Sequence, residues 1–265
     1  MVNIIKNFSL VIVFFLIAIS CVNSNIFVKD ANSINVLPRE SFVYLEKKLQ
    51  VTSCIGKQCL SMDYRSFASG FIVNIQDDGA FIITAAHFCE NQVMPGPGVK
   101  MKASYKANTI SGNKFSSTLL HYERNIDVCL LFAKNMLKEV KPVQIAKMAP
   151  VPGDKVFNIS APDGIYVPGM APILEGRYNG EMGGSSCYTV HAAPGSSGSM
   201  IVNKKGNLVG MIHSVYIRFN VISLSTNYYD LKRFIEKYLR KYILYKKIKD
   251  FVDDLNLDDI FTSKI

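Results

Sequence analysis

Short apolar or alternating segments recur along residues 69–224. They are rich in Val, Ile, Phe and Tyr, which is typical of β-strands. Turn-forming stretches such as Asp77-Asp78-Gly79 separate them. Many short strands with this punctuation predict an all-β barrel or sandwich. The predicted strands lie at residues 70–75, 80–86, 128–133, 155–160, 187–192, 199–203 and 208–217.

Helical periodicity is confined to the C-terminal part of the chain. Leu231, Phe234, Ile235 and Tyr238 recur at helical spacing within residues 231–250, with lysines and arginines between them. This predicts a basic amphipathic helix, followed by a tail that ends at residue 265. The apolar face of the helix packs on the body, or it contacts a membrane surface or an acidic partner.

Two segments precede the strand-rich region. Residues 1–24 contain an apolar run of 12 residues at 8–19, which suits a secretory signal better than a spanning helix. We expect a signal peptide or an N-terminal anchor here, and Cys21 leaves lipid attachment open. The protein is therefore expected to be secreted, periplasmic or on the cell surface. Residues 25–66 form a lead segment, in which residues 41–56 fit a short helix or a first strand.

Composition and charge add two limits. The chain has 265 residues, 49% of them hydrophobic, which is enough for one large core or two smaller ones. The net charge is +9, from 30 basic and 21 acidic residues. No motif of interleaved basic and aromatic residues points to a nucleic-acid partner. We expect a monomer, with any membrane contact made through the N-terminal segment or the basic helix.

The cysteines bear on compartment and cofactors. The chain has six: Cys21, Cys54, Cys59, Cys89, Cys129 and Cys187. An exported compartment permits disulfides, and loss of the first cysteine leaves an odd number. Cys54 pairs with Cys59, or one of the two pairs with Cys89. Cys129 and Cys187 lie in apolar runs and are expected as buried thiols. No spacing matches a zinc site, so no metal or other cofactor is expected.

Three residues, each a weak indication alone, together predict a catalytic site. His87 follows one predicted strand, Asp127 opens another, and Ser197 lies in the turn "HAAPGSSGSM". A serine hydroxyl attacks a carbonyl only when a neighbouring base accepts its proton. A carboxylate can hold that base in one tautomer. Gly195 and Gly198 permit a positive φ, which lets backbone N–H groups surround a developing negative charge. These residue types predict nucleophilic catalysis.

The motifs resemble those of the trypsin/chymotrypsin-like serine peptidases. "TAAH" ending at His87, "DVCLL" beginning at Asp127 and "GSSGS" around Ser197 are similar to the family's three motifs, in the family's order. The spacings of 40 and 70 residues suit a compact member. "PGDKVFNISAPDG" and "GNLVGMIHS" resemble strands of its second barrel, and the similarity covers about residues 69–226.

The resemblance implies an all-β fold over residues 67–230. The fold consists of two six-stranded antiparallel β-barrels of the chymotrypsin type, followed by the C-terminal α-helix. It implies an exported serine endopeptidase that cleaves polypeptide substrates through an acyl-enzyme, with Ser197 as nucleophile, His87 as acid/base and Asp127 orienting it. The N–H groups of Gly195 and Ser197 form the oxyanion hole. The strand expected to pair with the substrate backbone contains Ser214, Val215 and Tyr216. The alternative is a non-catalytic binding module on the same fold.

Three positions bear on activation and specificity. Ser196 stands where the digestive and clotting members carry an aspartate that pairs with a freed N-terminus, so no such zymogen switch is expected. His191 lies near the base of the primary pocket, where no aspartate favours Lys or Arg. His213 resembles a histidine that faces the P1 side chain in glutamyl endopeptidases and several viral relatives, which implies cleavage after Glu or Gln. Their companion threonine is replaced by Ala192, and the alternative is that His213 is simply a packed strand residue.

Overall fold

The computed structural model describes residues 37–91, 98–216, 219 and 221–254. The chain divides into two compact units, residues 1–37 and 38–265, and all elements below belong to the second. The predicted signal peptide or anchor at residues 1–24 lies outside the described residues. So does the predicted tail from residue 255 onward.

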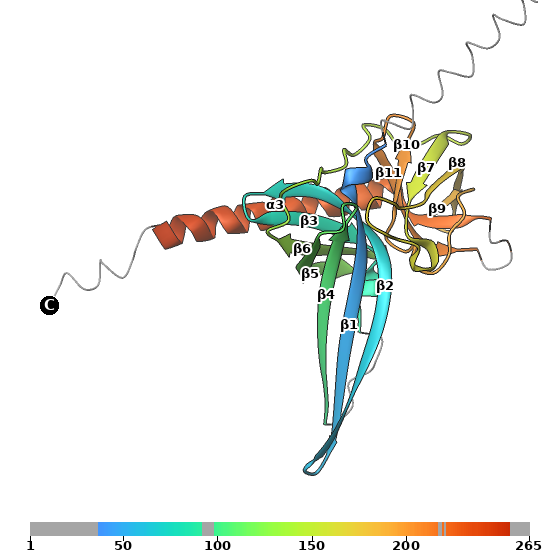
Figure 1. Ribbon diagram of the computed structural model, residues 1–265. Helices are drawn as coiled ribbons and strands as arrows, with labels where there is room; N and C mark the ends of the chain where they lie inside the picture. The colour runs from blue at the N-terminus through green and yellow to red at the C-terminus, as the bar shows by residue number, and fades with distance from the viewer. Residues whose placement is uncertain (1–36, 92–97, 217–218, 220, 255–265) are drawn as a thin grey trace, which may run out of the picture. The chain divides into compact units, whose positions relative to one another are not determined.

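Twelve strands close into two barrels (Figure 1). In pairing order, the first barrel contains β1 (Phe42–Ile55), β2 (Gln58–Gln76), β3 (Gly79–Thr84), β6 (Val128–Lys134), β5 (Lys114–Glu123) and β4 (Val99–Thr109). The second contains β10 (Met200–Asn203), β11 (Leu208–Val215), β12 (Ser223–Thr226), β9 (Ser185–Tyr188), β8 (Ile173–Met182) and β7 (Lys155–Ile159). A 3-10 turn (Arg39–Ser41) precedes β1, and a second 3-10 turn (Pro162–Gly164) and one helical turn, α2 (Ala86–Cys89), connect strands. The predicted pair of six-stranded antiparallel barrels is confirmed.

Each barrel encloses its own core. β3 is buried at all of its positions, which explains why its sequence reads as a continuous apolar run. Ile72, Ile82 and Leu131 meet inside the first barrel. Tyr188 and Ile201 occupy the corresponding place in the second. Each core fixes the strands of its barrel, and the loops that connect these strands carry the candidate site.

The first barrel begins at Phe42, within the range that the sequence assigned to a lead segment. β1 alternates buried and more exposed residues, with Val43, Leu45, Lys47 and Leu49 all directed inward. Lys47 interrupts the apolar alternation, yet it is only 5% exposed. Its ammonium can be buried because it donates hydrogen bonds to the carbonyls of Phe88 and Cys89 at 3.0 and 3.3 Å. Because a lysine occupies a buried position, the alternation of apolar and polar residues did not predict this strand unambiguously.

The C-terminal helix α3 (Tyr228–Asp254) packs one face on the barrels. Leu231, Phe234 and Tyr238 are buried, and the Tyr238 hydroxyl donates to Glu123 of β5 at 2.7 Å. The ring of His121 stacks on Tyr238 at 3.9 Å between centroids. The predicted amphipathic helix is therefore present, with its apolar stripe used for packing. Within the described ranges, no helix combines the length and apolarity needed to cross a membrane.

Two disulfides join four of the five described cysteines. Cys54–Cys59 closes the tip of the β1–β2 hairpin, which was one of the open pairings. Cys89–Cys129 joins α2 to β6, so the expectation that Cys129 is a free buried thiol is wrong. Cys187 is free and buried, as expected.

Candidate active site

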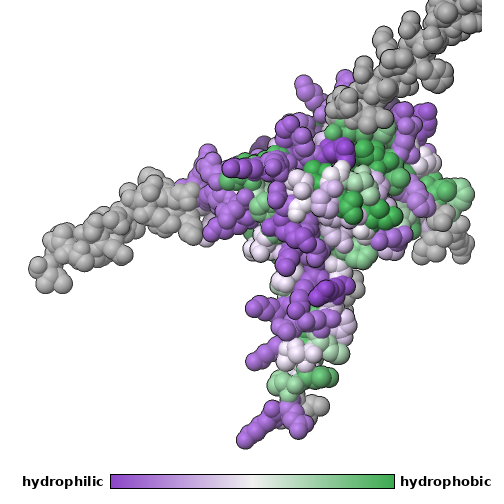
Figure 2. Space-filling view, viewed as in Figure 1, coloured by the Kyte–Doolittle hydropathy of each residue, from purple (hydrophilic) through white to green (hydrophobic). Residues whose placement is uncertain are grey.

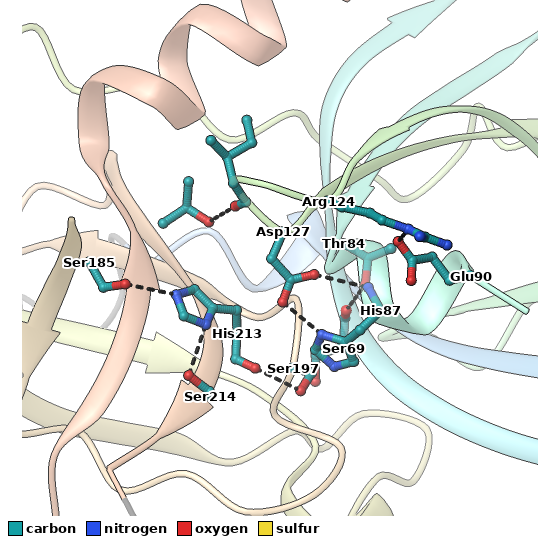
Figure 3. Close-up of polar contacts among 12 residues, drawn as sticks. Ser69, Thr84, His87, Glu90, Arg124, Asp127, Ser185, Ser197, His213 and Ser214 are labelled. Atoms are coloured by element: carbon teal, nitrogen blue, oxygen red, sulfur yellow. Dashed lines mark hydrogen bonds and ion pairs between the residues drawn. The ribbon is translucent and has the colours of Figure 1, made fainter. Parts of the chain in front are cut away.

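His87 and Asp127 come from opposite ends of neighbouring strands in the first barrel. His87 lies on α2, one turn of helix that follows β3, and Asp127 immediately precedes β6 (Figure 3). Because β3 and β6 are paired antiparallel, the end of one strand lies beside the start of the other. Cys89–Cys129 bridges the same two segments, two residues beyond each of these side chains.

Asp127 holds His87 through both carboxylate oxygens. Its Oδ1 accepts from the backbone N–H of His87 at 2.9 Å, and its Oδ2 lies 2.7 Å from the ring Nδ1 (Figure 3). A carboxylate oxygen accepts, so Nδ1 carries the proton and Nε2 is left as the acceptor. Asp127 itself adopts a φ of +52°, a left-handed conformation that non-glycine residues rarely take and that is concentrated at functional sites.

Ser197 lies in a loop whose two glycines have positive φ. Gly195 has φ +94° and Gly198 has φ +82°. A Cβ on Gly198 would overlap the hydroxyl of Thr84 and the carbonyl of Ser69, so only glycine allows this loop to approach the first barrel. The Ser69 N–H donates to the Ser197 carbonyl at 2.9 Å and links the two barrels at this point.

Between Ala193 and Ser199, two backbone N–H groups are left unbonded within the described part of the chain: those of Gly195 and Ser197. The Pro194 carbonyl accepts from Asp163 N–H at 2.6 Å. Because a trans peptide is planar, this bond turns the N–H of Gly195 the opposite way. The intervening Ser196 N–H is used locally, on the Ala193 carbonyl at 2.9 Å. The loop thus presents two fixed donors that can stabilise negative charge on a bound oxygen.

The Ser197 side chain forms no hydrogen bond with the His87 ring in this structure. Its Oγ donates to the His213 carbonyl at 3.5 Å, and among the described residues no hydrogen bond joins it to the His87 ring. Ser197 and His87 nevertheless line one cavity of about 430 Å³. Long or misaligned bonds of this kind are common in sites without substrate.

His213 is partly buried and lies near the carboxylate of Asp127. Its Nδ1 is 2.9 Å from the Ser214 hydroxyl and its Nε2 is 3.5 Å from that of Ser185 on β9 (Figure 3). Burial lowers the pKa of His213, while the charge of Asp127 opposes this shift and His87 adds to it. The ring is therefore kept neutral at pH 7.

Successive residues of the stretch 213–216, which is predicted to bind substrate, turn their backbone groups to opposite sides. Tyr216 gives its N–H to Ile222 beside β12 at 2.9 Å, and its carbonyl accepts from Phe219 at 3.0 Å. Antiparallel pairs alternate between bonded and non-bonded, so Ser214 also faces β12. The backbone groups of His213 and Val215 face the other way, and the His213 carbonyl indeed meets Ser197.

The remaining predicted residue is His191. It is exposed and forms no hydrogen bond or ion pair with the other described residues, so it stays apart from the cluster around Ser197. Sequence reasoning missed Ser69 and Asp163, which fix the loop that carries Ser197. Their only signal is that each precedes a glycine, which is too common to single them out.

The class of chymotrypsin-like peptidases is defined by two closed antiparallel barrels whose connecting loops carry a histidine, an aspartate and a serine between glycines. The trypsin-like peptidase domain family matches residues 68–211, which include His87, Asp127 and Ser197. This chain belongs to that family, so its domain is of the serine-peptidase type and its implied substrates are polypeptides. No curated protein matches the sequence.

Proposed function

We propose that this chain is an exported serine endopeptidase, with Ser197 as nucleophile, His87 as general acid and base, and Asp127 as the group that orients His87. The observation that carries the proposal is that both carboxylate oxygens of Asp127 accept hydrogen bonds from His87. Nε2 of His87 is then left as a proton acceptor, and His87 lines the same cavity as Ser197.

The reaction follows from this geometry. His87 Nε2 takes the proton of Ser197 Oγ as the Oγ–C bond forms at the scissile carbonyl. The carbonyl oxygen becomes negative and accepts hydrogen bonds from the N–H groups of Gly195 and Ser197. His87 then protonates the leaving nitrogen, and the C–N bond breaks. Water attacks the resulting ester and gives a proton to His87. The Oγ–C bond then breaks, His87 returns the proton to Ser197 Oγ, and the acyl product leaves as a carboxylic acid.

The test is hydrolysis of a peptide library by the purified chain, with Ser197→Ala and His87→Ala as variants. Turnover that falls by at least about 10³-fold in both variants supports the proposal. The alternative is a non-catalytic binding module, favoured by the bond from Ser197 to the His213 carbonyl instead of to His87. Peptide binding by a folded chain without turnover would establish that alternative.

We propose cleavage after Glu or Gln as the specificity, and it is supported by His213 alone. A neutral imidazole can hydrogen-bond an amide or a carboxylate of the P1 side chain. Because His213 also lies beside Asp127, its loss affects all substrates to some extent. The informative quantity is therefore a ratio: His213→Ala should lower kcat/KM more for Glu or Gln substrates than for Leu or Phe substrates. An equal loss for all four contradicts the preference.

Export is proposed from residues 1–24 and is supported by the two disulfides, which persist in oxidising compartments. Cell fractionation with N-terminal sequencing tests it. Export predicts protein outside the cytoplasm, and protein found only in the cytoplasm with residue 1 intact contradicts it. We also propose a monomer and membrane contact through the basic face of α3. Co-sedimentation with anionic liposomes should then weaken when α3 lysines are neutralised.

A further inference from the structure

The second strand of the first barrel is much longer than the barrel needs. Residues 58–68 of β2 pair with β1 only, and pairing with β3 begins at Phe71. Figure 1 shows β1, β2 and β4 continuing together as a ribbon beyond the shorter strands. Among the described residues, the outer edge of β2 from Gln58 to Ala68 therefore has no strand partner.

The hydrogen bonds of Ser69 show which backbone groups face this open edge. Its cross-strand neighbour is Tyr44, yet its N–H donates to Ser197 and its carbonyl accepts from Thr84 at 2.7 Å. Ser69 thus turns its backbone away from β1. Antiparallel ladders alternate at every second residue, so the same holds two, four and six residues earlier. The outward-facing residues are Phe67, Arg65 and Asp63.

This edge is continuous with the candidate active site. The cavity that holds Ser197 and His87 extends along β2 past Phe67 as far as Tyr64. Phe88, Leu49 and Pro194 contribute apolar walls. Further along the ribbon, Leu60 and Met62 are 67% and 47% exposed, and Figure 2 shows apolar (green) among polar (purple) side chains there. A chain leaving Ser197 in this direction meets an unpaired strand edge and apolar side chains.

The charge along the cavity is positive. Arg65 is exposed and forms no ion pair within the described residues, whereas the ammonium of Lys47 in the same wall is already bonded to backbone carbonyls. The one acidic residue lining the cavity, Glu90, is already paired with Arg124. An acidic group of a ligand is therefore the complement that this wall lacks.

We propose that the outer edge of β2, from Asp63 to Phe67, binds the leaving-group side of an extended polypeptide substrate as an added strand, with an acidic side chain of the substrate beside Arg65. The inference rests on the proposed function, because it takes Ser197 as the point of attack. The acyl side then lies along β11, where the His213 carbonyl meets Ser197, and the leaving side lies along β2. At about 3.3 Å per residue, this stretch of β2 accommodates roughly four substrate residues.

The first test measures binding without turnover. The Ser197→Ala chain is titrated into a fluorescein-labelled peptide of alternating valine and glutamate, and into the matching valine–lysine peptide. The acidic peptide should bind at least about tenfold more tightly, and Arg65→Glu should abolish that difference. Arg240→Glu, on an exposed part of α3, is the matched charge control and should preserve it. Equal affinities for the two peptides, or equal effects of the two reversals, overturn the proposal.

The second test addresses the backbone. Single N-methyl groups placed in turn along the acidic peptide should weaken binding at every second position, because only alternate amides face the strand edge. A loss without this two-residue period contradicts strand addition. Sedimentation of the free chain covers the other occupant of the edge: a dimer that Arg65→Glu dissolves would assign β2 to a second copy instead.

The two proposals fail separately. If Ser197 reacts with a fluorophosphonate but the acidic peptide does not bind, the β2 site is wrong and the proposed function stands. If the peptide binds with the expected period but Ser197 is inert, the proposed function is wrong.

Discussion

The prediction that bears most closely on the proposed mechanism is Asp127→Asn. The aspartate accepts two hydrogen bonds from His87, one from the backbone at 2.9 Å and one from Nδ1 at 2.7 Å. Asparagine has a single acceptor oxygen. If that oxygen keeps the backbone bond, the amide NH₂ faces Nδ1, which must then become the acceptor. The ring proton moves to Nε2 and is directed at the cavity, so His87 can no longer accept the proton of Ser197.

The expected magnitude follows from the wrong tautomer. In triads of this family the same change lowers kcat by about 10⁴, equivalent to about 5 kcal/mol in the barrier. The assay is the rate of Ser197 modification by a fluorophosphonate together with peptide turnover, and Asp77→Asn is the matched surface control. The melting temperature of both variants checks the fold. A folded Asp127→Asn chain that reacts within tenfold of the parent would refute the reasoning.

Three further predictions concern stability and activation. Replacing Cys89 and Cys129 by serine opens a loop of 40 residues, and thermal or denaturant unfolding should show a loss of about 4 kcal/mol; an unchanged midpoint contradicts the structural role. Because burial lowers the pKa of His213, the unfolded chain binds the extra proton, so stability should decline as pH falls below the ordinary value of 6.5. His213→Gln should flatten this decline in urea titrations, leaving the smaller slope due to His121, whose pKa burial also lowers; an unaltered slope is inconsistent with the assignment. Ser196 replaces the activating aspartate and is held locally, so adding two residues to a mature N-terminus should leave kcat/KM unchanged, whereas a need for one freed N-terminus would show a zymogen switch.

The sequence predicted those strands whose side chains are apolar on both faces. β3 and β6 read as continuous apolar runs and form the wall that presents His87 and Asp127. β4 and β5 were missed because their outer faces carry lysines and serines, leaving a weak alternation. β1 was left open between helix and strand because Lys47 stands in its buried row, and the carbonyls that satisfy this ammonium come from residues about 40 positions away.

The candidate site was predictable as a set of residues but not as a geometry. The motifs placed His87 and Asp127 together, which the hydrogen bonds confirm. They could not reveal which residues of the 213–216 stretch face Ser197. An irregularity in pairing between Ile212 and Ser214 sets that choice, and a one-residue slip reverses every strand residue. The same limit hid the Cys89–Cys129 bond, which depends on the antiparallel register of β3 and β6.

The most direct test of the central claim is covalent labelling of the native chain by a fluorophosphonate, read by intact mass and peptide mapping. The account predicts one adduct per chain, on Ser197, absent in Ser197→Ala and in heat-unfolded protein. Folded protein that gains no adduct, or gains it on another residue, would contradict the claim that Ser197 is the nucleophile.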